Sequence, residues 1–371
     1  LGGLKRMKKV ALFFHSFHGG GVEKVMYNLA IQFAKLGLDV QLVLIEPGVW
    51  FSSLEIPDSI KVFFLESKRS VYALPKLTHY LRINRPDILI SGHTGLNVLA
   101  SVAVWLSGNR IKHIITEHSP ISRNISSMSC LKRTLLPTAV RIAYRRRHCI
   151  VAVSNDVRSD LMMLSGLSEN QISVIHNPVL NDDFSRKVNE HVDHQWFRDN
   201  IPVILGVGRL TPQKDFGTLI RAFALVRSEV PARLVILGEG DERKNLEALV
   251  ADLGLQDSVE LLGYVPNPYP YMAAATVFAL SSIFEGFGNV IVEALAAGTP
   301  VVSTDCEGGP KDILDCGKYG RLVPVGNPSQ LAEAIIGVIK NRTQSDLSVL
   351  KGRAQMFTSH HVARQYMDLF S

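Results

Sequence analysis

Short aliphatic runs alternate with amphipathic stretches along most of this 371-residue chain. In the first half, the aliphatic runs occupy residues 10–14, 40–45, 62–65, 88–91, 113–116 and 149–153. The residues between them carry apolar side chains at helical spacing and predict helices over about 23–36, 75–84, 96–106 and 156–164. Strands that alternate with helices in this way pair in parallel, because each helix carries the chain back to the starting edge of the sheet. The pattern therefore predicts a doubly wound parallel sheet with helices on both faces.

The second half of the chain repeats this alternation. Strands are predicted at 203–207, 233–237, 259–263, 277–280, 300–304 and 320–324, and a final helical segment at about 347–370. Because the chain is too long for one ordinary core, we expect two α/β domains, residues 1–180 and 195–355. Residues 179–200 are polar and aperiodic, and we interpret them as the interdomain connection. Ligands of open parallel sheets bind at the carboxyl ends of the strands, so a cleft between two such domains is the expected ligand site.

One segment of the second half, residues 284–302 (FEGFGNVIVEALAAGTPVV), combines glycines, two carboxylates and a helix start. It predicts a glycine-rich loop that carries Glu285, and a helix that begins near Asn289 with Glu293 in its first turn. Free amides at a helix N-terminus bind anions, and a neighbouring glycine lets a phosphate approach the backbone. The segment therefore suits a sugar joined to a nucleoside diphosphate. The alternative is a plain βα unit with two surface glutamates.

A second loop places two cations after the predicted strand 203–207. Residues 208–215 (GRLTPQKD) present Arg209 and Lys214 where a parallel sheet binds its ligand. An arginine fork and a lysine point charge can neutralise a diphosphate leaving group without a metal. Two surface charges beside a helix N-terminus are the alternative.

These two segments resemble the signatures of retaining GT-B glycosyltransferases of family 4. Glu285 and Glu293 match the family's glutamate-x7-glutamate motif, and Arg209 and Lys214 match its G-R-L-x-x-x-K element. The resemblance implies that Glu293 binds the ribose, that Glu285 lies against the transferred sugar, and that the two cations hold the diphosphate. It also implies the GT-B fold, in which two Rossmann-like domains are followed by a final helix, about 356–371, that packs back on the first domain.

Further positions match the family more loosely. Contacts with the donor nucleotide sugar are implied for Gly20, Gly21, Gly238, Gly240, Tyr264, Val265, Phe287, Gly288, Asn289 and Val290. His118 falls where the family has a histidine close to the reacting sugar, and it joins Glu285 as a catalytic candidate. Glu23 lies in the same glycine-rich turn as Gly20 and has the alternative role of stabilising its own helix start.

No aspartate-x-aspartate metal motif is evident in the sequence. Asp305-Cys306-Glu307 has the spacing but carries glutamate in place of the second aspartate. The four cysteines form no C-x-x-C pair and no metal-ligand spacing. We therefore expect metal-independent transfer, with the nucleotide sugar as co-substrate and no further cofactor.

Charge is unevenly distributed along the chain. Residues 1–178 hold 22 Lys and Arg against 11 Asp and Glu, whereas the remainder holds 18 against 23. The main contributors lie in one segment and are interleaved with apolar residues: Lys132, Arg133, Arg141, Arg145, Arg146 and Arg147. Such a segment is typical of helices at an anionic membrane surface, although a solvated helix face gives the same pattern. Nucleic acid is not expected as a partner, because no aromatic stacking platform accompanies the charge.

The resemblance implies a retaining enzyme that moves a hexose or N-acetylhexosamine from a nucleotide sugar, with UDP the expected nucleotide, to an acceptor hydroxyl in an α-linkage. A front-face path is implied, and a covalent route through Glu285 stays open. With the basic first half, this predicts a lipid-linked or polysaccharide acceptor and a peripheral position on the cytoplasmic face of a membrane. The alternatives are a hydrolase or epimerase of the same fold, or a non-catalytic subunit that binds the nucleotide sugar. A dehydrogenase is disfavoured, because the first strand lacks the dinucleotide fingerprint.

Overall fold

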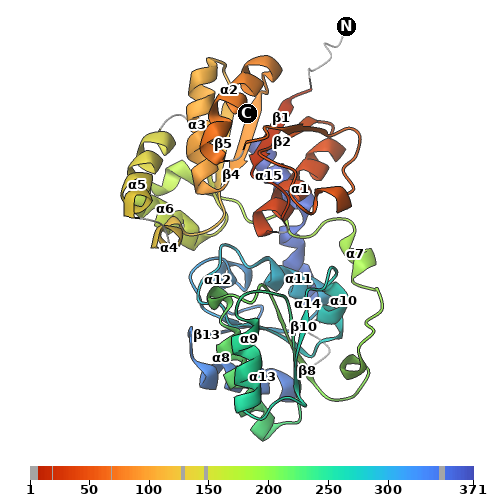
Figure 1. Cartoon of the computed structure of the whole chain (residues 1–371). Helices are drawn as coiled ribbons and strands as arrows, with labels where there is room; N and C mark the ends of the chain where they lie inside the picture. Colours follow the sequence, from red (N-terminus) through yellow and green to blue (C-terminus); the bar gives the residue numbers. More distant parts are fainter. Residues whose placement is uncertain (1–6, 19, 68, 127–129, 146–148, 342–346) are drawn as a thin grey trace. The chain divides into compact units, whose positions relative to one another are not determined.

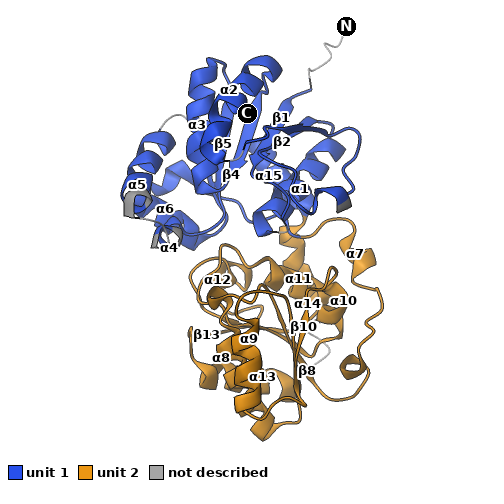
Figure 2. Cartoon of the chain, viewed as in Figure 1, with its two compact units in different colours: residues 1–179, 359–371 blue, residues 180–358 orange. Residues whose placement is uncertain are grey.

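A computed structural model describes residues 7–18, 20–67, 69–126, 130–145, 149–341 and 347–371 of the chain (Figure 1). The chain divides into two compact units, which Figure 2 colours separately. Unit 1 contains Leu1–Val179 and Ser359–Ser371, and unit 2 contains Leu180–Thr358. In the part of the chain that is described, no helix is long and apolar enough to cross a membrane.

Unit 1 is built around a parallel sheet, as the alternating pattern predicted. Its described strands lie in the order β3-β2-β1-β4-β5-β6-β7, and every pairing is parallel. The strands are β1 (Lys9–Phe14), β2 (Asp39–Leu44), β3 (Lys61–Phe64), β4 (Ile88–Gly92), β5 (Lys112–Glu117), β6 (Cys149–Ala152) and β7 (Ile172–Val174). The helices are α1 (Gly21–Lys35), α2 (Ala73–Asn84), α3 (Thr94–Ser107), α4 (Ile121–Ser126), α5 (Cys130–Tyr144), α6 (Asn155–Ser165) and α15 (Ser359–Asp368), with the 3₁₀ turns η1 (Phe51–Ser53), η2 (Ser70–Tyr72) and η3 (Glu169–Gln171).

Both faces of the unit 1 sheet are buried. Along β1, Val10 and Leu12 point into a core formed with α1 and α15, whereas Ala11 and Phe13 point into a second core formed with α2 and α3. Successive residues of a strand face opposite sides of the sheet, so a run of apolar residues such as β1 requires a covered sheet on each side. The predicted two-sided sheet is therefore confirmed.

Unit 2 repeats this architecture with a smaller sheet. Its described strands lie in the order β10-β9-β8-β11-β12-β13, all in parallel. They are β8 (Val203–Val207), β9 (Arg233–Leu237), β10 (Val259–Gly263), β11 (Val277–Leu280), β12 (Val301–Thr304) and β13 (Arg321–Val323). The helices are α7 (Phe184–Lys187), α8 (Phe216–Glu229), α9 (Arg243–Asp252), α10 (Tyr269–Ala274), α11 (Asn289–Ala297), α12 (Pro310–Ile313), α13 (Pro328–Lys340) and α14 (Leu347–Ala354), with η4 (Gln195–Phe197), η5 (Pro212–Lys214) and η7 (Gln355–Phe357).

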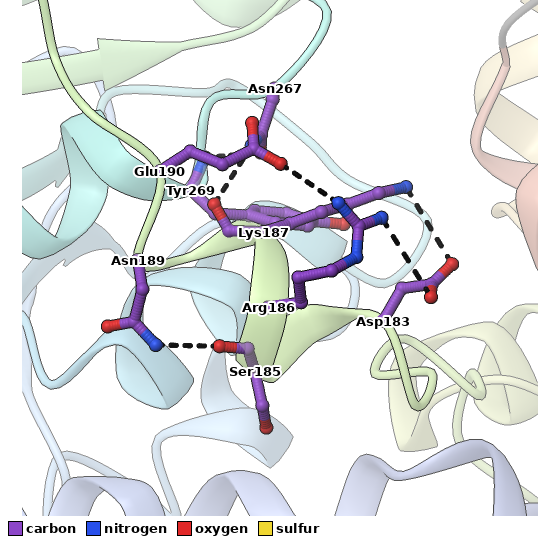
Figure 3. Close-up of polar contacts among 8 residues, drawn as sticks. All are labelled: Asp183, Ser185, Arg186, Lys187, Asn189, Glu190, Asn267 and Tyr269. Carbon is purple, nitrogen blue, oxygen red and sulfur yellow. Dashed lines mark hydrogen bonds and ion pairs between the residues drawn. The ribbon is translucent and has the colours of Figure 1, made fainter.

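The residues predicted to be the interdomain connection, from Leu180 onward, group with unit 2. Around α7 these residues make several polar contacts (Figure 3). The Asn267 amide donates to the Lys187 carbonyl at 2.9 Å and to the Glu190 carboxylate at 2.7 Å. Such contacts have no sequence period, which explains why the sequence of this segment shows no helical or strand pattern.

Two further contacts join this segment to α10 and to the edge strand β10. The rings of Phe184 and Tyr269 lie 4.8 Å apart, and the imidazole of His194 lies 3.0 Å from the carboxylate of Glu260 in β10. An exposed edge strand presents unpaired backbone groups, and a covering segment protects them. The segment therefore completes the fold of unit 2.

The chain enters and leaves unit 2 at two residues that lie side by side. Leu180 pairs with Thr358, and its amide donates to the Phe357 carbonyl at 3.2 Å. Helix α15 then belongs to unit 1, where Val362 and Tyr366 are fully buried. The return to unit 1 begins at Ser359, whereas the sequence indicated about residue 356.

Candidate functional site

The loop that follows β8 carries the two predicted cations. The Gly208 amide donates to the Leu237 carbonyl at 2.9 Å, which fixes the start of this loop against the end of β9. Arg209 is exposed, and η5 then positions Lys214 with its side chain 17% exposed. The Ser281 hydroxyl donates to the Lys214 carbonyl at 2.8 Å, so the loop is also tied to the end of β11.

Lys214 and Glu285 form a buried ion pair. The Nζ of Lys214 lies 2.5 Å from Oε1 of Glu285, and the Ser282 hydroxyl donates to the same oxygen at 2.6 Å. The Glu285 side chain is only 7% exposed. A buried charge is tolerated when it is paired and hydrogen-bonded, and removing one partner leaves the other uncompensated. The structure therefore brings together two residues that the sequence proposed from separate motifs.

The backbone around Glu285 is packed so closely that only glycine fits opposite it. The Glu285 amide donates to the Glu307 carbonyl at 2.8 Å, and the following Gly308 has φ near +130°. A Cβ on Gly308 would lie 2.1 Å from the Glu285 carbonyl oxygen, and a Cβ on Gly309 would lie 2.1 Å from that of Phe287. The glycines of residues 308–309 thus hold the Glu285 loop in place.

Helix α11 begins where the sequence predicted, but two details differ. Gly288 is the N-cap with φ near +92°, and the first turn that follows it contains Asn289 and Val290. Glu293 is the fifth helical residue and lies in the second turn, so its expected place in the first turn is wrong. The ring of Phe287 is 2% exposed and packs 5.6 Å from that of Phe357, so Phe287 can offer a ligand its backbone but not its ring.

The structure explains why residues 238 and 240 are glycines: Gly238 and Gly240 lie too close to a neighbouring loop for a side chain. The Leu210 amide donates to the Glu239 carbonyl at 2.9 Å, so the loops after β8 and β9 run side by side. A Cβ on Gly238 would lie 1.8 Å from the Gly208 carbonyl oxygen, and one on Gly240 would lie 2.3 Å from that of Leu210. Both glycines let the arginine-bearing loop approach its neighbour.

Tyr264 and Val265 follow β10 at the same edge of the sheet. The Gly238 amide donates to the Gly263 carbonyl at 2.8 Å, which joins the end of β10 to the loops just described. Tyr264 is exposed, and Val265 is half-buried. The structure therefore leaves the Tyr264 ring accessible to a planar ligand at the strand ends.

In unit 1, the glycine-rich turn before α1 is closed by its own helix. Oε2 of Glu23 accepts hydrogen bonds from the amides of His18 and Gly20, at 2.6 and 2.9 Å. This is a capping box, and it shows that Glu23 does stabilise the start of its helix. Gly20 is half-buried and Gly21 is exposed, so both stay candidates for a backbone contact with a ligand.

His118 follows β5 and is 8% exposed. Its Nε2 lies 2.9 Å from the Thr116 hydroxyl, and the absence of a side chain on Gly92 leaves room for the ring. Burial lowers the pKa of His118 to about 4, and Asn177 opposes this shift only in part. His118 is therefore a neutral imidazole at neutral pH, which suits a hydrogen-bonding role better than that of a cation.

A buried carboxylate beside His118 was missed by the sequence interpretation. Glu117 accepts hydrogen bonds from the hydroxyl of Thr94 at 2.9 Å, from the amide of Asn97 at 2.8 Å, and from the hydroxyl of Tyr144. Burial raises the pKa of Glu117 to about 7, although these three hydrogen bonds oppose the shift. Tyr144 ends helix α5, so the carboxylate ties that helix to the strand that leads to His118.

The described part of the basic segment forms helix α5 and Arg145, which follows it. Val140, Ala143 and Tyr144 are buried against unit 1, whereas Leu135 and Ile142 are 58% and 61% exposed. The described arginines are all exposed: Arg133, Arg141 and Arg145. Arg146, Arg147 and the side chain of Lys132 lie outside the described part. The helix therefore presents apolar and cationic side chains to solvent together.

Within the described ranges, no three His, Cys, Asp or Glu side chains are grouped so that they could hold a metal ion. Asp305-Cys306-Glu307 follows β12, but the Cys306 side chain is buried and burial raises its pKa to about 12. The Glu307 carbonyl is used to hold Glu285.

Comparison with known proteins adds to this geometry. A family model described as Glycosyltransferase Family 4 matches residues 19–181, and one described as Glycosyl transferases group 1 matches residues 189–354. The chain is 28% identical over 383 residues to the Campylobacter jejuni N-acetylgalactosamine-N,N'-diacetylbacillosaminyl-diphospho-undecaprenol 4-alpha-N-acetylgalactosaminyltransferase, covering 96% of this chain and 98% of that protein. It is also 28% identical over 365 residues to the lipopolysaccharide core biosynthesis glycosyltransferase LpsE of Rhizobium meliloti, covering 96% and 98% of the two chains.

Among solved structures, HepE of Anabaena, in complex with UDP, matches with a TM-score of 0.77 at 23% identity, covering 97% of this chain and 99% of that one. At this identity the likeness concerns the fold, which is the arrangement of two parallel α/β sheets described above.

Proposed function

The chain belongs to family 4 of the GT-B glycosyltransferases, and from that premise we propose that it transfers a hexose or N-acetylhexosamine from a UDP-sugar to a lipid-linked or polysaccharide acceptor, with retention of configuration. The observation that carries the proposal is the buried Lys214–Glu285 pair at the carboxyl edge of the unit 2 sheet, beside exposed Arg209.

In this proposal, three groups of unit 2 contact the donor diphosphate. Arg209 supplies a fork and Lys214 a point charge, and the first turn of α11, at Gly288 and Asn289, supplies backbone amides. Positive groups aimed at a departing phosphate lower the barrier to transfer, because negative charge develops there in the transition state. Glu293 is the proposed ligand of the ribose. UDP is favoured over other nucleotides because HepE, which shares the fold, binds UDP.

In the proposed reaction, the bond between the anomeric carbon and the β-phosphate oxygen breaks while a bond to the acceptor oxygen forms on the same face. The acceptor hydroxyl gives its proton to the departing phosphate oxygen, so no separate base and no metal is needed. In this proposal, the Glu285 carboxylate stabilises positive charge on the sugar ring, and neutral His118 offers a hydrogen bond to a sugar hydroxyl.

The proposed acceptor class rests on the relatives and on helix α5. The C. jejuni relative is named for a diphospho-undecaprenol acceptor, and LpsE for lipopolysaccharide core biosynthesis. Exposed Leu135 and Ile142 beside Arg133 and Arg141 give this helix the composition of a surface that contacts anionic lipid. We therefore place the enzyme in glycolipid or polysaccharide synthesis, with α5 against the cytoplasmic face of a membrane.

A thermal-shift panel tests the donor site first. The full chain is heated with UDP, GDP or ADP and with their hexose conjugates, each with and without EDTA. A ligand at about 100 times its dissociation constant stabilises the folded state by about 2.7 kcal/mol, which gives a clear shift of Tm. We expect UDP and one UDP-sugar to stabilise the protein equally well in EDTA.

The outcomes separate this proposal from its alternatives. Stabilisation that disappears in EDTA would contradict the metal-free site, and no shift with any nucleotide would contradict the donor assignment. If a UDP-sugar binds but is consumed at the same rate without any glycan acceptor, the enzyme is a hydrolase or epimerase. If it binds and is never consumed, the chain is a binding subunit.

A further inference from the structure

Glu117 is the last acceptor in a chain of hydrogen bonds through the core of unit 1. Nε2 of the buried His113 lies 2.8 Å from the Ser91 hydroxyl, which donates to Oδ1 of Asn97 at 2.6 Å. Because that hydroxyl gives its one hydrogen to Asn97, the His113 ring supplies the hydrogen of the first bond. The Asn97 amide then donates to Oε1 of Glu117 at 2.8 Å. The chain of donors therefore runs from His113 to the Glu117 carboxylate.

Two hydroxyl groups also donate to this carboxylate. Thr94 donates to Oε2 at 2.9 Å, and Tyr144 donates to Oε1, the oxygen that also accepts from Asn97. In each of these three bonds Glu117 is the acceptor, and the residue is only 1% exposed. An ionised carboxylate can only accept, so the arrangement fits that state. A protonated carboxyl group has a hydrogen to donate, and one of the two hydroxyls would have to turn round to accept it.

These bonds join three elements at the end of β5. The donors come from the start of α3 and from the last residue of α5, and Glu117 is itself the last residue of β5. The Asn97 amide donates to the Thr116 carbonyl at 2.9 Å as well as to Glu117. His118 follows directly, and its Nε2 lies 2.9 Å from the Thr116 hydroxyl. The position of the His118 ring therefore depends on how α3 and α5 are held against this strand.

The backbone at the start of α3 is strained. His93, the N-cap of α3, has φ near +87°, a conformation that residues other than glycine rarely adopt. Strain of this kind persists only where the neighbouring contacts hold it, and it is concentrated at functional sites. The Asn97 backbone amide donates to the His93 carbonyl at 2.9 Å, and the Asn97 side chain donates to Glu117. Because β4 and β5 are neighbours, Glu117 secures the residues that follow both strands, His93 and His118.

Resting on the glycosyltransferase function proposed above, we propose that Glu117 is a positioning residue for sugar transfer: its carboxylate holds α3 and α5 against β5 and thereby sets the position of the His118 ring. Glu117 is buried and acts through His118, without touching the substrate. The end of α5 takes part because Tyr144 is one of the three donors.

The protonation state of Glu117 changes near neutral pH, which makes the positioning role measurable. Burial raises the pKa of Glu117 to about 7, its three hydrogen bonds oppose this shift, and the charge of Asp160 on α6 adds to it. The other titratable groups in the elements packed around it are Tyr144, His93, His113 and His118. Burial lowers the pKa of His118 to about 4, so its ring stays neutral while Glu117 titrates. A change at the His118 ring near pH 7 therefore reports the ionisation of Glu117.

NMR of the full chain with isotope-labelled histidine tests the proposal, in a titration from about pH 5.5 to 8.5. The His118 ring signal is assigned by its loss in His118→Asn. Glu117→Gln is neutral at every pH, and its new amide can donate to the Thr94 hydroxyl, so it mimics the protonated state and keeps the fold. Tyr144→Phe removes one donor.

Each variant has a matched control in unit 1. Glu55→Gln neutralises an exposed glutamate outside the network. Tyr80→Phe removes the hydroxyl of another buried tyrosine, which donates to Gln41 rather than to a carboxylate.

In the wild type and both controls, we expect the His118 signal to shift with a midpoint near pH 7. Glu117→Gln should show no such transition. Tyr144→Phe should move the midpoint to higher pH, because the lost hydrogen bond had lowered the pKa of Glu117. A His118 signal that stays constant in the wild type would overturn the proposal, as would a transition that survives in Glu117→Gln.

Kinetics tests the link to catalysis. Transfer from the UDP-sugar that stabilises the protein to a short-chain polyprenyl diphosphate N-acetylhexosamine is followed as UDP release at about pH 8, where Glu117 is ionised. We expect kcat of Glu117→Gln to fall about tenfold, the worth of one hydrogen bond to a charged group, with KM for the UDP-sugar within about twofold of the wild type. An unchanged kcat would overturn the positioning role. No transfer by the wild type would instead count against the proposed function, and the NMR titration would still decide whether Glu117 positions His118.

Discussion

The carboxyl edges of the two sheets present their charged groups in opposite ways. In unit 2, Lys214 and Glu285 are paired with each other, and their side chains are only 17% and 7% exposed. In unit 1, His15, His18 and Glu46 are about half exposed. Both edges nevertheless rest on a closely packed backbone in which a glycine lies against a carbonyl: Gly308 in unit 2 and Gly48 in unit 1.

This difference explains why one edge is conspicuous in the sequence and the other is not. A buried pair restricts its neighbours, because each must supply a partner, a hydroxyl or the space of a glycine. The motif around Glu285 therefore contains the residue types that the buried pair requires. An exposed cluster such as that of Glu46 places few demands on its neighbours, so it leaves no recognisable spacing in the sequence.

The largest effect is expected when the buried pair of unit 2 is broken. Lys214→Met removes a cation from the proposed diphosphate site and leaves the Glu285 charge without its partner. We expect kcat for sugar transfer to fall by about 10²–10³-fold, the usual loss when one group that stabilises a departing anion is removed. Lys244→Met, an exposed lysine on α9, is the control and should keep full activity. A kcat for Lys214→Met within tenfold of the wild type would contradict the assigned role.

A second test concerns the backbone on which the unit 2 edge rests. Gly238→Ala places a Cβ 1.8 Å from the Gly208 carbonyl oxygen at a φ that only glycine adopts freely. We expect this to lower the free energy of unfolding by about 3–5 kcal/mol. Gly337→Ala in helix α13 meets no atom within 4 Å and should instead stabilise by about 0.5–1 kcal/mol. Tm values that shift equally in the two variants would show that the loop has room to move.

The smallest expected effect is on the pH dependence of folding stability, to which the adjacent residues Glu117 and His118 of unit 1 contribute with opposite signs. Burial raises the pKa of Glu117 from 4.5 to about 7, so its contribution to stability is present below pH 4.5 and is lost as pH rises through 7. Burial lowers the pKa of His118 from 6.5 to about 4, so its contribution is present above pH 6.5 and is lost as pH falls through 4. The two contributions oppose each other between these limits.

Single variants should therefore reveal opposite pH dependences. From pH 5 to 6.5, the stability of Glu117→Gln relative to the wild type should rise by about 1–2 kcal/mol, and that of His118→Asn should fall by a similar amount. Tm of the full chain at several pH values measures both, with Glu55→Gln as the control. If both variants changed in the same direction, the assigned protonation states would be wrong.

Much of the fold was accessible from the sequence, because strands such as β1 and β8 are short apolar runs between helical stretches. Segments without a sequence period could not be assigned from the sequence. Residues 180–199 are held to unit 2 by single contacts, such as that of Asn267 with Glu190, and no repeating face marks them. Helices α4 and α5 were not assigned as elements, and α5 contains Pro137, a residue that ordinarily ends a helix.

The candidate site likewise contains residues that the sequence predicted and one that it missed. The charged residues of unit 2 were predicted because a motif names them, and Lys214 and Glu285 do meet. The start of α11 at Asn289 was predicted correctly, but Glu293 is the fifth residue of the helix and lies just past the first turn, because one turn holds 3.6 residues. Glu117 escaped notice because its partners come from Thr94, Asn97 and Tyr144, which are distant in sequence and meet only in the folded sheet.

The return of helix α15 to unit 1 has a consequence for synthesis on the ribosome. Val362, Tyr366 and Phe370 fill the same core as β1 and α1, yet the whole of unit 2 is translated between them. Unit 1 therefore emerges first, but one apolar face of it stays uncovered until unit 2 and then α15 have been translated. Unit 2, which is continuous in sequence, can finish folding first. A nascent chain that stalls before residue 359 would expose that face to chaperones and proteases.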